Sequence, residues 1–171
     1  MSPRPVLVVI GAPGAGKTRV GRRVARILGV DFIDVDRRIV ARYGPIAQIF
    51  AERGESYFRQ LERIEVEKAL EEHAVVSLGG GAILNEDTQI DLIDQTVALM
   101  TVSAEAVESR LGGGKRPLLA DGISAWRALV DARKPIYERL ATRRWDTSER
   151  GIDEVAEEIA DWIQQREHSN S

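Results

Sequence analysis

The chain has 171 residues, 43% of them hydrophobic and 30% charged, and a formal net charge of −3. This length and apolar content suffice for one domain with its own core, and the near-balanced charge argues against a nucleic-acid-binding or anionic-membrane surface. The absence of cysteine excludes disulfides, thiolate metal sites and a cysteine nucleophile. Both histidines, His73 and His168, lie in polar surroundings without a partner at metal-ligand spacing. We therefore expect chemistry based on carboxylates, lysine, arginine and a hard metal ion held by oxygen atoms.

The first predicted element is a strand over residues 6–10, where a continuous β-branched run is typical of a strand buried on both faces of a parallel sheet. A glycine-rich turn over 11–16 follows, and apolar residues then recur at helical spacing from Val20 until Gly29 ends the helix. The apolar run is too short to cross a membrane, and the turn stands where a signal peptide requires a longer apolar region. We expect a cytoplasmic protein without membrane association.

Later segments alternate between strand and helix patterns. Strands are predicted over 75–78, 97–100 and 145–147, and helices over 59–72, 86–93, 104–110, 124–140 and 152–166. This alternation predicts a layered α/β sheet. The segment 111–123 contains glycine hinges, two positive charges and no helical period, features typical of a mobile lid. We expect one domain over 1–167 and a disordered tail over 168–171.

Residues 11–18, with the sequence Gly-Ala-Pro-Gly-Ala-Gly-Lys-Thr, fit the complete P-loop pattern and lie between the predicted strand and helix, where a P-loop functions. Gly14, Ala15 and Gly16 belong to the part of the loop whose backbone N–H groups surround phosphates at the start of a helix. Lys17 is expected to bridge the outer phosphates, and Thr18 to place its hydroxyl on Mg²⁺. A glycine-rich turn without nucleotide is the alternative.

Two carboxylates, Asp34 and Asp36, stand at the end of a predicted strand. Residues two apart on an extended strand project in similar directions, here toward the sheet edge where α/β proteins bind ligands. We expect Asp36 to orient an acceptor hydroxyl and take its proton, and Asp34 to contact Mg²⁺ through water. An acidic cap of the helix that contains Arg37 is the alternative, and both interpretations can hold together.

Arg59 lies near a predicted helix start and offers a planar fork for a carboxylate, beside the apolar wall of Phe58. Pairing with Glu55 or Glu62, at a spacing of four or three residues, is the alternative explanation. The segment therefore predicts either a carboxylate-binding site or a surface ion pair.

The three glycines at 79–81 follow a buried strand and let a backbone lie against a ligand, although a plain turn would use the same residues. Arg116, in the predicted lid, fits the arginine that catalysts of phosphoryl transfer commonly need. Arg133 precedes Pro135 within a helical stretch and can present a fixed guanidinium group. Each of these features alone could be structural.

Taken in order, these segments resemble the shikimate kinases, a branch of the nucleoside monophosphate kinase-like P-loop enzymes, over nearly the whole chain. The resemblance rests on blocks at 11–18, 34–36, 54–62, 79–81, 116–119 and 133–137. It implies a three-layer α/β/α P-loop kinase fold with a central five-stranded parallel sheet. It also implies transfer of the γ-phosphate of ATP, with Mg²⁺, to the 3-hydroxyl of shikimate, a step of aromatic amino acid biosynthesis. We expect a monomer.

The resemblance also implies roles for individual residues. Shikimate would be held by the side chains of Asp36, Arg59 and Arg133, by the backbone of Gly80 and Gly81, and by the rings of Phe50 and Phe58. ATP would be bound by Gly14, Ala15, Gly16, Lys17, Thr18, Arg110 and Arg116, with Arg110 against the adenine. Lys17, Asp36 and Arg116 would be catalytic, and Thr18 and Asp34 would serve Mg²⁺. Two departures from the family pattern are Thr18-Arg19, where many members have Ser-Thr, and the absence of proline from 148–152.

Other functions share parts of this pattern. A gluconate-type kinase would share the P-loop and the sheet but need not keep both Arg59 and Arg133, and a nucleoside monophosphate kinase would more often have a longer lid. A non-catalytic nucleotide-dependent switch would retain the P-loop without turnover, and the presence of Lys17, Asp36 and Arg116 together argues against that function.

Overall fold

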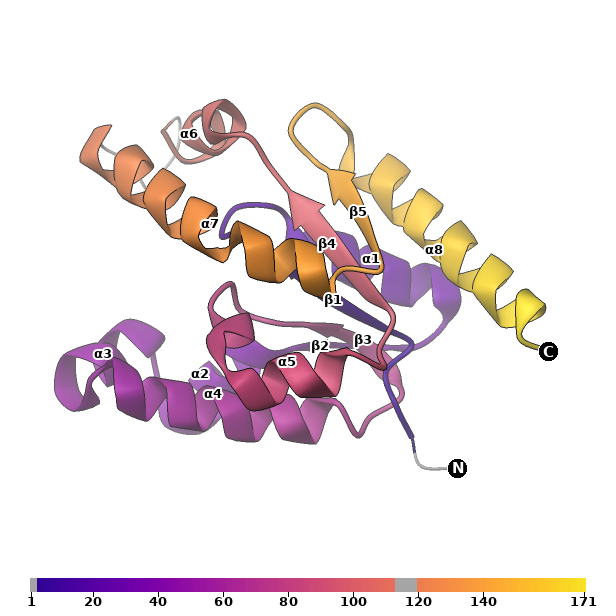
Figure 1. Cartoon of the computed structure of the whole chain (residues 1–171), viewed down its shortest axis with the longest axis horizontal. Helices are drawn as coiled ribbons and strands as arrows, with labels where there is room; N and C mark the ends of the chain where they lie inside the picture. The colour runs from indigo at the N-terminus through magenta and orange to yellow at the C-terminus, as the bar shows by residue number, and fades with distance from the viewer. Residues whose placement is uncertain (1–2, 113–119) are drawn as a thin grey trace.

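The computed structural model of the chain describes residues 3–112 and 120–171. Its sheet contains five parallel strands in the order β2-β3-β1-β4-β5 (Figure 1). The strands are β1 (Leu7–Gly11), β2 (Asp31–Asp34), β3 (Ala74–Ser77), β4 (Val97–Thr101) and β5 (Arg143–Asp146). The predicted five-stranded parallel sheet is confirmed.

Helices cover both faces of the sheet. Helices α1 (Lys17–Leu28) and α8 (Ile152–Ser169) pack together on one face, as Figure 1 shows. The other face is covered by α2 (Val35–Tyr43), α4 (Glu55–Ala69), α5 (Glu86–Leu92) and α7 (Ala120–Leu140), and α3 (Ile46–Arg53) packs on α4. A 3₁₀ turn, η1 (Ala82–Leu84), follows β3, and α6 (Ala104–Gly112) follows β4. This arrangement confirms the three-layer α/β/α fold.

The central strand explains why the sequence begins with a continuous apolar run. Side chains of a strand alternate between the two faces of a sheet. Leu7 and Val9 belong to the core shared with α1 and α8, whereas Val8 and Ile10 belong to the core on the opposite face. All four are at most 1% exposed. A strand between two helical layers requires apolar residues at every position, and this requirement accounts for the run.

Several boundaries differ from those predicted. Helix α2 begins at Val35, directly after β2, so the strand does not continue through Asp36. Helix α3 falls in a segment for which no helix was predicted, and α4 begins four residues before the predicted start. Helix α8 continues through Ser169, so most of the segment predicted as a disordered tail is helical or caps the helix. Asn170 ends α8 by donating its N–H to the carbonyls of Arg166 and Glu167.

Because all five strands are parallel, their carboxyl ends lie at one edge of the sheet. The turn over 11–16 leaves β1 there, Asp34 ends β2, and residues 79–81 follow β3. This edge therefore gathers the segments from which the site was predicted. No helix among the described residues is long and apolar enough to cross a membrane.

Candidate active site

The P-loop connects β1 to α1, as predicted. Gly11 has φ of +148°, and a Cβ atom there would collide with the backbone oxygen of Met100 on β4, so the start of the loop requires glycine. Lys17 donates from Nζ to the carbonyls of Gly11 at 2.7 Å and Ala12 at 3.0 Å. Burial lowers the pKa of Lys17 to about 8, against the opposing effect of the nearby carboxylates of Asp36 and Asp34. The lysine is thus held over the loop that it was predicted to serve.

Asp34 and Asp36 lie together, but not in the way the strand argument predicted. Asp34 is the N-cap of α2, where its Oδ1 accepts from the backbone N–H of Arg37 at 3.3 Å, and Asp36 lies in the first helical turn. The prediction that both project from an extended strand was therefore wrong, because the chain turns into a helix between them. Asp34 Oδ2 also accepts from Thr18 Oγ1 at 2.9 Å, so the capping residue also contacts the end of the P-loop, and its role toward Mg²⁺ stays a prediction.

Burial and neighbouring charges act on the carboxylate of Asp36. The pKa of Asp36 is raised, first by burial and then by the negative charge of Asp34, with Lys17 and Arg59 opposing the rise. A carboxylate with a raised pKa binds a proton more readily than an ordinary aspartate, which is what a general base requires. Both aspartates line a cavity of about 200 Å³ with Lys17 and Thr18.

The oxygen atoms around this cavity fit Mg²⁺. Thr18 Oγ1 and Asp34 Oδ2 are hard donors at the mouth of the P-loop, 2.9 Å apart. No cluster of three or more metal-binding side chains occurs in the described part of the chain. Mg²⁺ commonly takes one or two protein ligands and completes its octahedron with phosphate oxygens and water, so a full protein cage is not needed.

The three glycines after β3 face three different side chains. A Cβ atom at Gly79 would lie 2.6 Å from Asp36 Oδ1, and one at Gly81 would lie 2.5 Å from Arg59 Nη2. A Cβ atom at Gly80 would lie 3.4 Å from Arg133 Nη1. The backbone of 79–81 therefore passes close to each of the three side chains predicted to hold the acceptor. A side chain at Gly79 or Gly81 would displace one of them, which accounts for glycine there.

Arg59 is placed by two carboxylates of its own helix. Its guanidinium group lies 2.7 Å from Glu62 and 3.5 Å from Glu55, which are the pairs that the alternative explanation proposed. The side chain of Arg59 is nevertheless only 25% exposed and that of Glu62 only 4%. Burial raises the pKa of Glu62, although the hydrogen bond from Arg59 opposes that rise. The pairing thus fixes Arg59 beside Gly81 and is compatible with carboxylate binding.

Arg133 and Tyr137 approach the same site from α7. The positive charge of Arg133 acts on Lys17, Glu62 and Tyr137, which places its guanidinium group among them. The side chain of Arg133 also interacts with the hydroxyl of Tyr137. Tyr137 is 3% exposed and donates its hydroxyl to the carbonyl of Gly80 at 2.6 Å.

The remaining predicted contacts are placed as follows. The rings of Phe50 and Phe58 lie 4.9 Å apart, with Phe58 buried and Phe50 36% exposed. The guanidinium carbon of Arg59 lies 5.2 Å from the centre of the Phe58 ring. Arg110 donates to the carbonyl of Gly14 at 3.1 Å and also to that of Thr147, so it lies against the P-loop. Its contact with adenine stays a prediction.

Arg116 lies outside the described residues, as does the centre of the segment 111–123 that was predicted to be a lid. Sequence reasoning assigned no role to three donors that reach P-loop and acceptor-site carbonyls, namely Trp126, Tyr137 and Thr147. Tyr137 was visible as part of the block at 133–137. Trp126 and Thr147 gave no signal of their own, because their partners lie more than 100 residues away in sequence.

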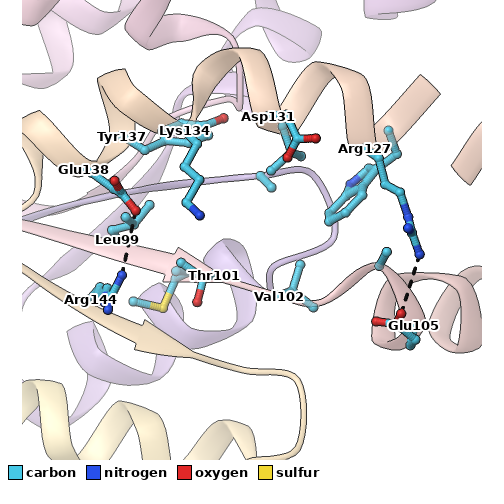
Figure 2. Close-up of a pocket in the computed structure, with 15 residues that line it drawn as sticks. Leu99, Thr101, Val102, Glu105, Arg127, Asp131, Lys134, Tyr137, Glu138 and Arg144 are labelled. Carbon is cyan, nitrogen blue, oxygen red and sulfur yellow. Dashed lines mark hydrogen bonds and ion pairs between the residues drawn. The ribbon is translucent and has the colours of Figure 1, made fainter. Parts of the chain in front are cut away.

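A second cavity, of about 480 Å³, lies between α7 and β4 (Figure 2). Lys134 extends from α7 into this cleft above Thr101 of β4, whereas the preceding residue, Arg133, belongs to the acceptor site. Two ion pairs join its walls, Arg127 with Glu105 at 3.5 Å and Arg144 with Glu138 at 3.8 Å. The cleft contains none of the predicted site residues. The predicted P-loop residues and both aspartates line the smaller cavity instead.

The chain is similar to known proteins over almost its full length. The pattern of the Shikimate kinase family matches residues 13–164. The shikimate kinase of Thermobifida fusca (strain YX) is 49% identical over 164 residues, covering 94% of this chain and 95% of that protein.

Two solved structures bear on the fold. A shikimate kinase from Acinetobacter baumannii in complex with shikimate superposes with a TM-score of 0.86 at 29% identity, covering 96% of this chain and 94% of that one. A gluconokinase from Sinorhizobium meliloti superposes with a TM-score of 0.65 at 16% identity, covering 93% of this chain and 91% of that one. The likeness to the gluconokinase extends to the fold alone.

Proposed function

The chain belongs to the shikimate kinase family and is an ATP-dependent kinase of shikimate, and we propose that the residues gathered at the P-loop edge carry this reaction. The observation that carries the proposal is the close approach of Gly79, Gly80 and Gly81 to Asp36, Arg133 and Arg59 respectively. Two arginines and one aspartate around a bare backbone match the chemistry of an acceptor with one carboxylate and several hydroxyl groups. The P-loop lies directly beside this group, since Pro13 Cδ is 3.1 Å from the position of a Cβ atom at Gly80.

In the proposed arrangement, Arg59 and Arg133 bind the carboxylate of shikimate and Asp36 binds its hydroxyl groups. Arg59 Nε is a buried donor without a partner among the described residues. It can therefore donate to a carboxylate without first breaking an internal hydrogen bond. Gly80 and Gly81 supply backbone contacts, and Phe50 and Phe58 line the ring.

The transfer step follows from the positions of Asp36 and Lys17. Asp36 accepts the proton of the 3-hydroxyl of shikimate as the hydroxyl oxygen attacks the γ-phosphorus of ATP. The bond between that phosphorus and the β,γ-bridging oxygen breaks, and ADP leaves. Lys17 neutralises the outer phosphates, and Gly14, Ala15 and Gly16 supply the loop around them. Mg²⁺, held by Thr18 and through water by Asp34, would neutralise charge on the phosphates of ATP. Arg116 would stabilise the transferring group, and Arg110 would lie against the adenine.

The direct test is ADP release from Mg-ATP with shikimate, gluconate, quinate or AMP offered separately. We expect saturable turnover with shikimate alone. Preferred turnover with gluconate or AMP would contradict the assignment of Arg59 and Arg133 to a cyclic carboxylate. Steady ATP binding without turnover on any acceptor would favour a non-catalytic nucleotide-dependent switch.

Asp36→Asn tests the base. This variant should keep the affinity for ATP, because the P-loop is untouched, and lose about 10²- to 10⁴-fold in kcat, the range for a general base. Asp31→Asn, an exposed aspartate at the start of β2, is the matched control. Unchanged turnover in Asp36→Asn would remove Asp36 from the mechanism.

We also propose that the enzyme acts as a monomer in the cytoplasm, as a single domain over 1–167 with a lid over about 111–123. The support for a single domain is that both cores share one sheet. Light scattering coupled to gel filtration should give the mass of one 18.9 kDa chain.

A further inference from the structure

The carbonyl groups of the P-loop accept hydrogen bonds from side chains. Each of the five consecutive carbonyls of residues 11–15 accepts at least one such hydrogen bond. The donors are Lys17 to Gly11 and Ala12, Trp126 to Pro13, Arg110 to Gly14, and Thr147 to Ala15. In a planar trans peptide the C=O and the following N–H point in opposite directions. A donor that holds one of these carbonyls therefore also fixes where the next N–H points, and the loop binds phosphate through its N–H groups.

Helix α7 contributes three side chains to this edge of the sheet, and they lie on one stripe of its surface. Trp126, Arg133 and Tyr137 are spaced by seven and four residues, which places them on one face of a helix. Trp126 Nε1 lies 2.8 Å from the carbonyl oxygen of Pro13, and Arg133 lies beside Gly80. Lys134, one position on, extends into the cleft of Figure 2, which Trp126 and Tyr137 also line. The stripe therefore faces the P-loop and the acceptor side together.

Tyr137 joins the two halves of the site directly. Its hydroxyl lies 2.6 Å from the carbonyl oxygen of Gly80 and 3.3 Å from that of Gly11. Gly80 belongs to the wall of the acceptor site and Gly11 begins the P-loop, so one hydroxyl fixes the separation of the two. Gly11 has a second donor in Lys17, whereas Gly80 has no other side-chain donor among the described residues.

We propose that Trp126 and Tyr137 are positioning residues that make α7 the common frame of the nucleotide and acceptor sites. Trp126 orients the peptide between Pro13 and Gly14, whose N–H faces the phosphates, and Tyr137 sets the distance between the acceptor wall and the P-loop. This inference rests on the proposed function only for the identity of the acceptor. Trp126 acts on nucleotide binding, whereas Tyr137 acts on the alignment of two bound substrates.

The two residues therefore predict different kinetic signatures. Trp126→Phe keeps an aromatic ring and removes the N–H, and we expect the Kd and KM for ATP to rise about tenfold, the usual effect of one lost hydrogen bond. The KM for shikimate should not change. Tyr137→Phe should lower kcat about tenfold or more, since small misalignments of reacting groups are strongly felt, while the Kd for ATP stays within about twofold.

The experiment combines steady-state kinetics with calorimetric titration of ATP in the absence of acceptor. Trp162→Phe on α8 and Tyr43→Phe at the end of α2 are matched controls, because neither side chain lies at the site. Thermal unfolding of each variant separates loss of fold from loss of alignment.

If Tyr137→Phe does not fold, the ATP titration and kinetics of Trp126→Phe alone test the inference. Equal losses in every parameter, or wild-type values in both variants, would overturn the inference. Because the ATP titration needs no acceptor, it reads the role of Trp126 even if shikimate is not the substrate.

Discussion

Gly79→Ala tests the close approach of the glycine segment to the base. A Cβ atom at this position would lie 2.6 Å from Asp36 Oδ1, 0.8 Å closer than the 3.4 Å at which ordinary contact begins. The carboxylate is the end of a flexible side chain, so it can move aside, and the fold should lose no more than about 1 kcal/mol. The base would then be displaced by most of an ångström. Such a shift costs about 10²-fold in kcat, equal to about 2.7 kcal/mol of barrier.

The assay is kcat with saturating ATP and shikimate, together with calorimetric ATP binding. Gly151→Ala is the control, because a Cβ atom there meets nothing within 4 Å. Gly81→Ala provides a contrast, since it would push Arg59 instead and should raise the KM for shikimate more than it lowers kcat. If Gly79→Ala keeps kcat within about threefold of the wild type, the glycine does not position Asp36 and our reasoning fails.

Three further predictions follow from the same geometry. Arg59→Ala should weaken shikimate binding by roughly 2 to 5 kcal/mol and leave ATP binding unchanged, and equal loss for both ligands in titrations would indicate a structural arginine. The value of kcat/KM for ATP should decrease as the pH rises above about 8, because Lys17 must be protonated to pair with phosphates. It should also decrease as the pH falls, with a midpoint above the ordinary pKa of aspartate, because Asp36 must be ionised and its pKa is raised. An alkaline limb near the ordinary pKa of lysine would contradict this assignment. Gly11→Ala should yield little folded protein, since the new Cβ would strike the backbone of Met100, which cannot move aside; a normal thermal unfolding transition would refute that expectation.

The local parts of the site were predictable from sequence. The P-loop follows from eight consecutive residues, and its flanking strand and helix follow from their apolar periods, so Lys17 and Thr18 were placed correctly. Asp34 and Asp36 were identified as a pair, but their geometry was not, because the strand-to-helix change at Val35 depends on a cap that competes with continuation of the strand. The residue types thus brought the two aspartates together even though the backbone assignment was wrong.

The assembly of the site required tertiary structure. That Gly79, Gly80 and Gly81 each face a different polar side chain depends on the order of β2, β3 and β1 and on how α4 and α7 pack. No local pattern encodes these relations. The same holds for the bond from Trp126 to Pro13, which joins residues 113 positions apart. Helix α3 was missed because its eight residues, between Pro45 and Gly54, are too few to show a clear apolar period.

The charges of the site explain why the fold can hold it together before any substrate arrives. Lys17, Arg59 and Arg133 are the cations, and Asp34, Asp36 and Glu62 are the carboxylates that interact with them. The two sets balance, so the buried groups stabilise one another without a ligand. ATP adds negative charge beside Lys17, which favours its protonated form and raises the depressed pKa of the lysine. In the proposed arrangement, the acceptor carboxylate adds negative charge beside Arg59 and Arg133. In that arrangement each substrate neutralises a different part of the cationic set, and Asp36 takes the proton.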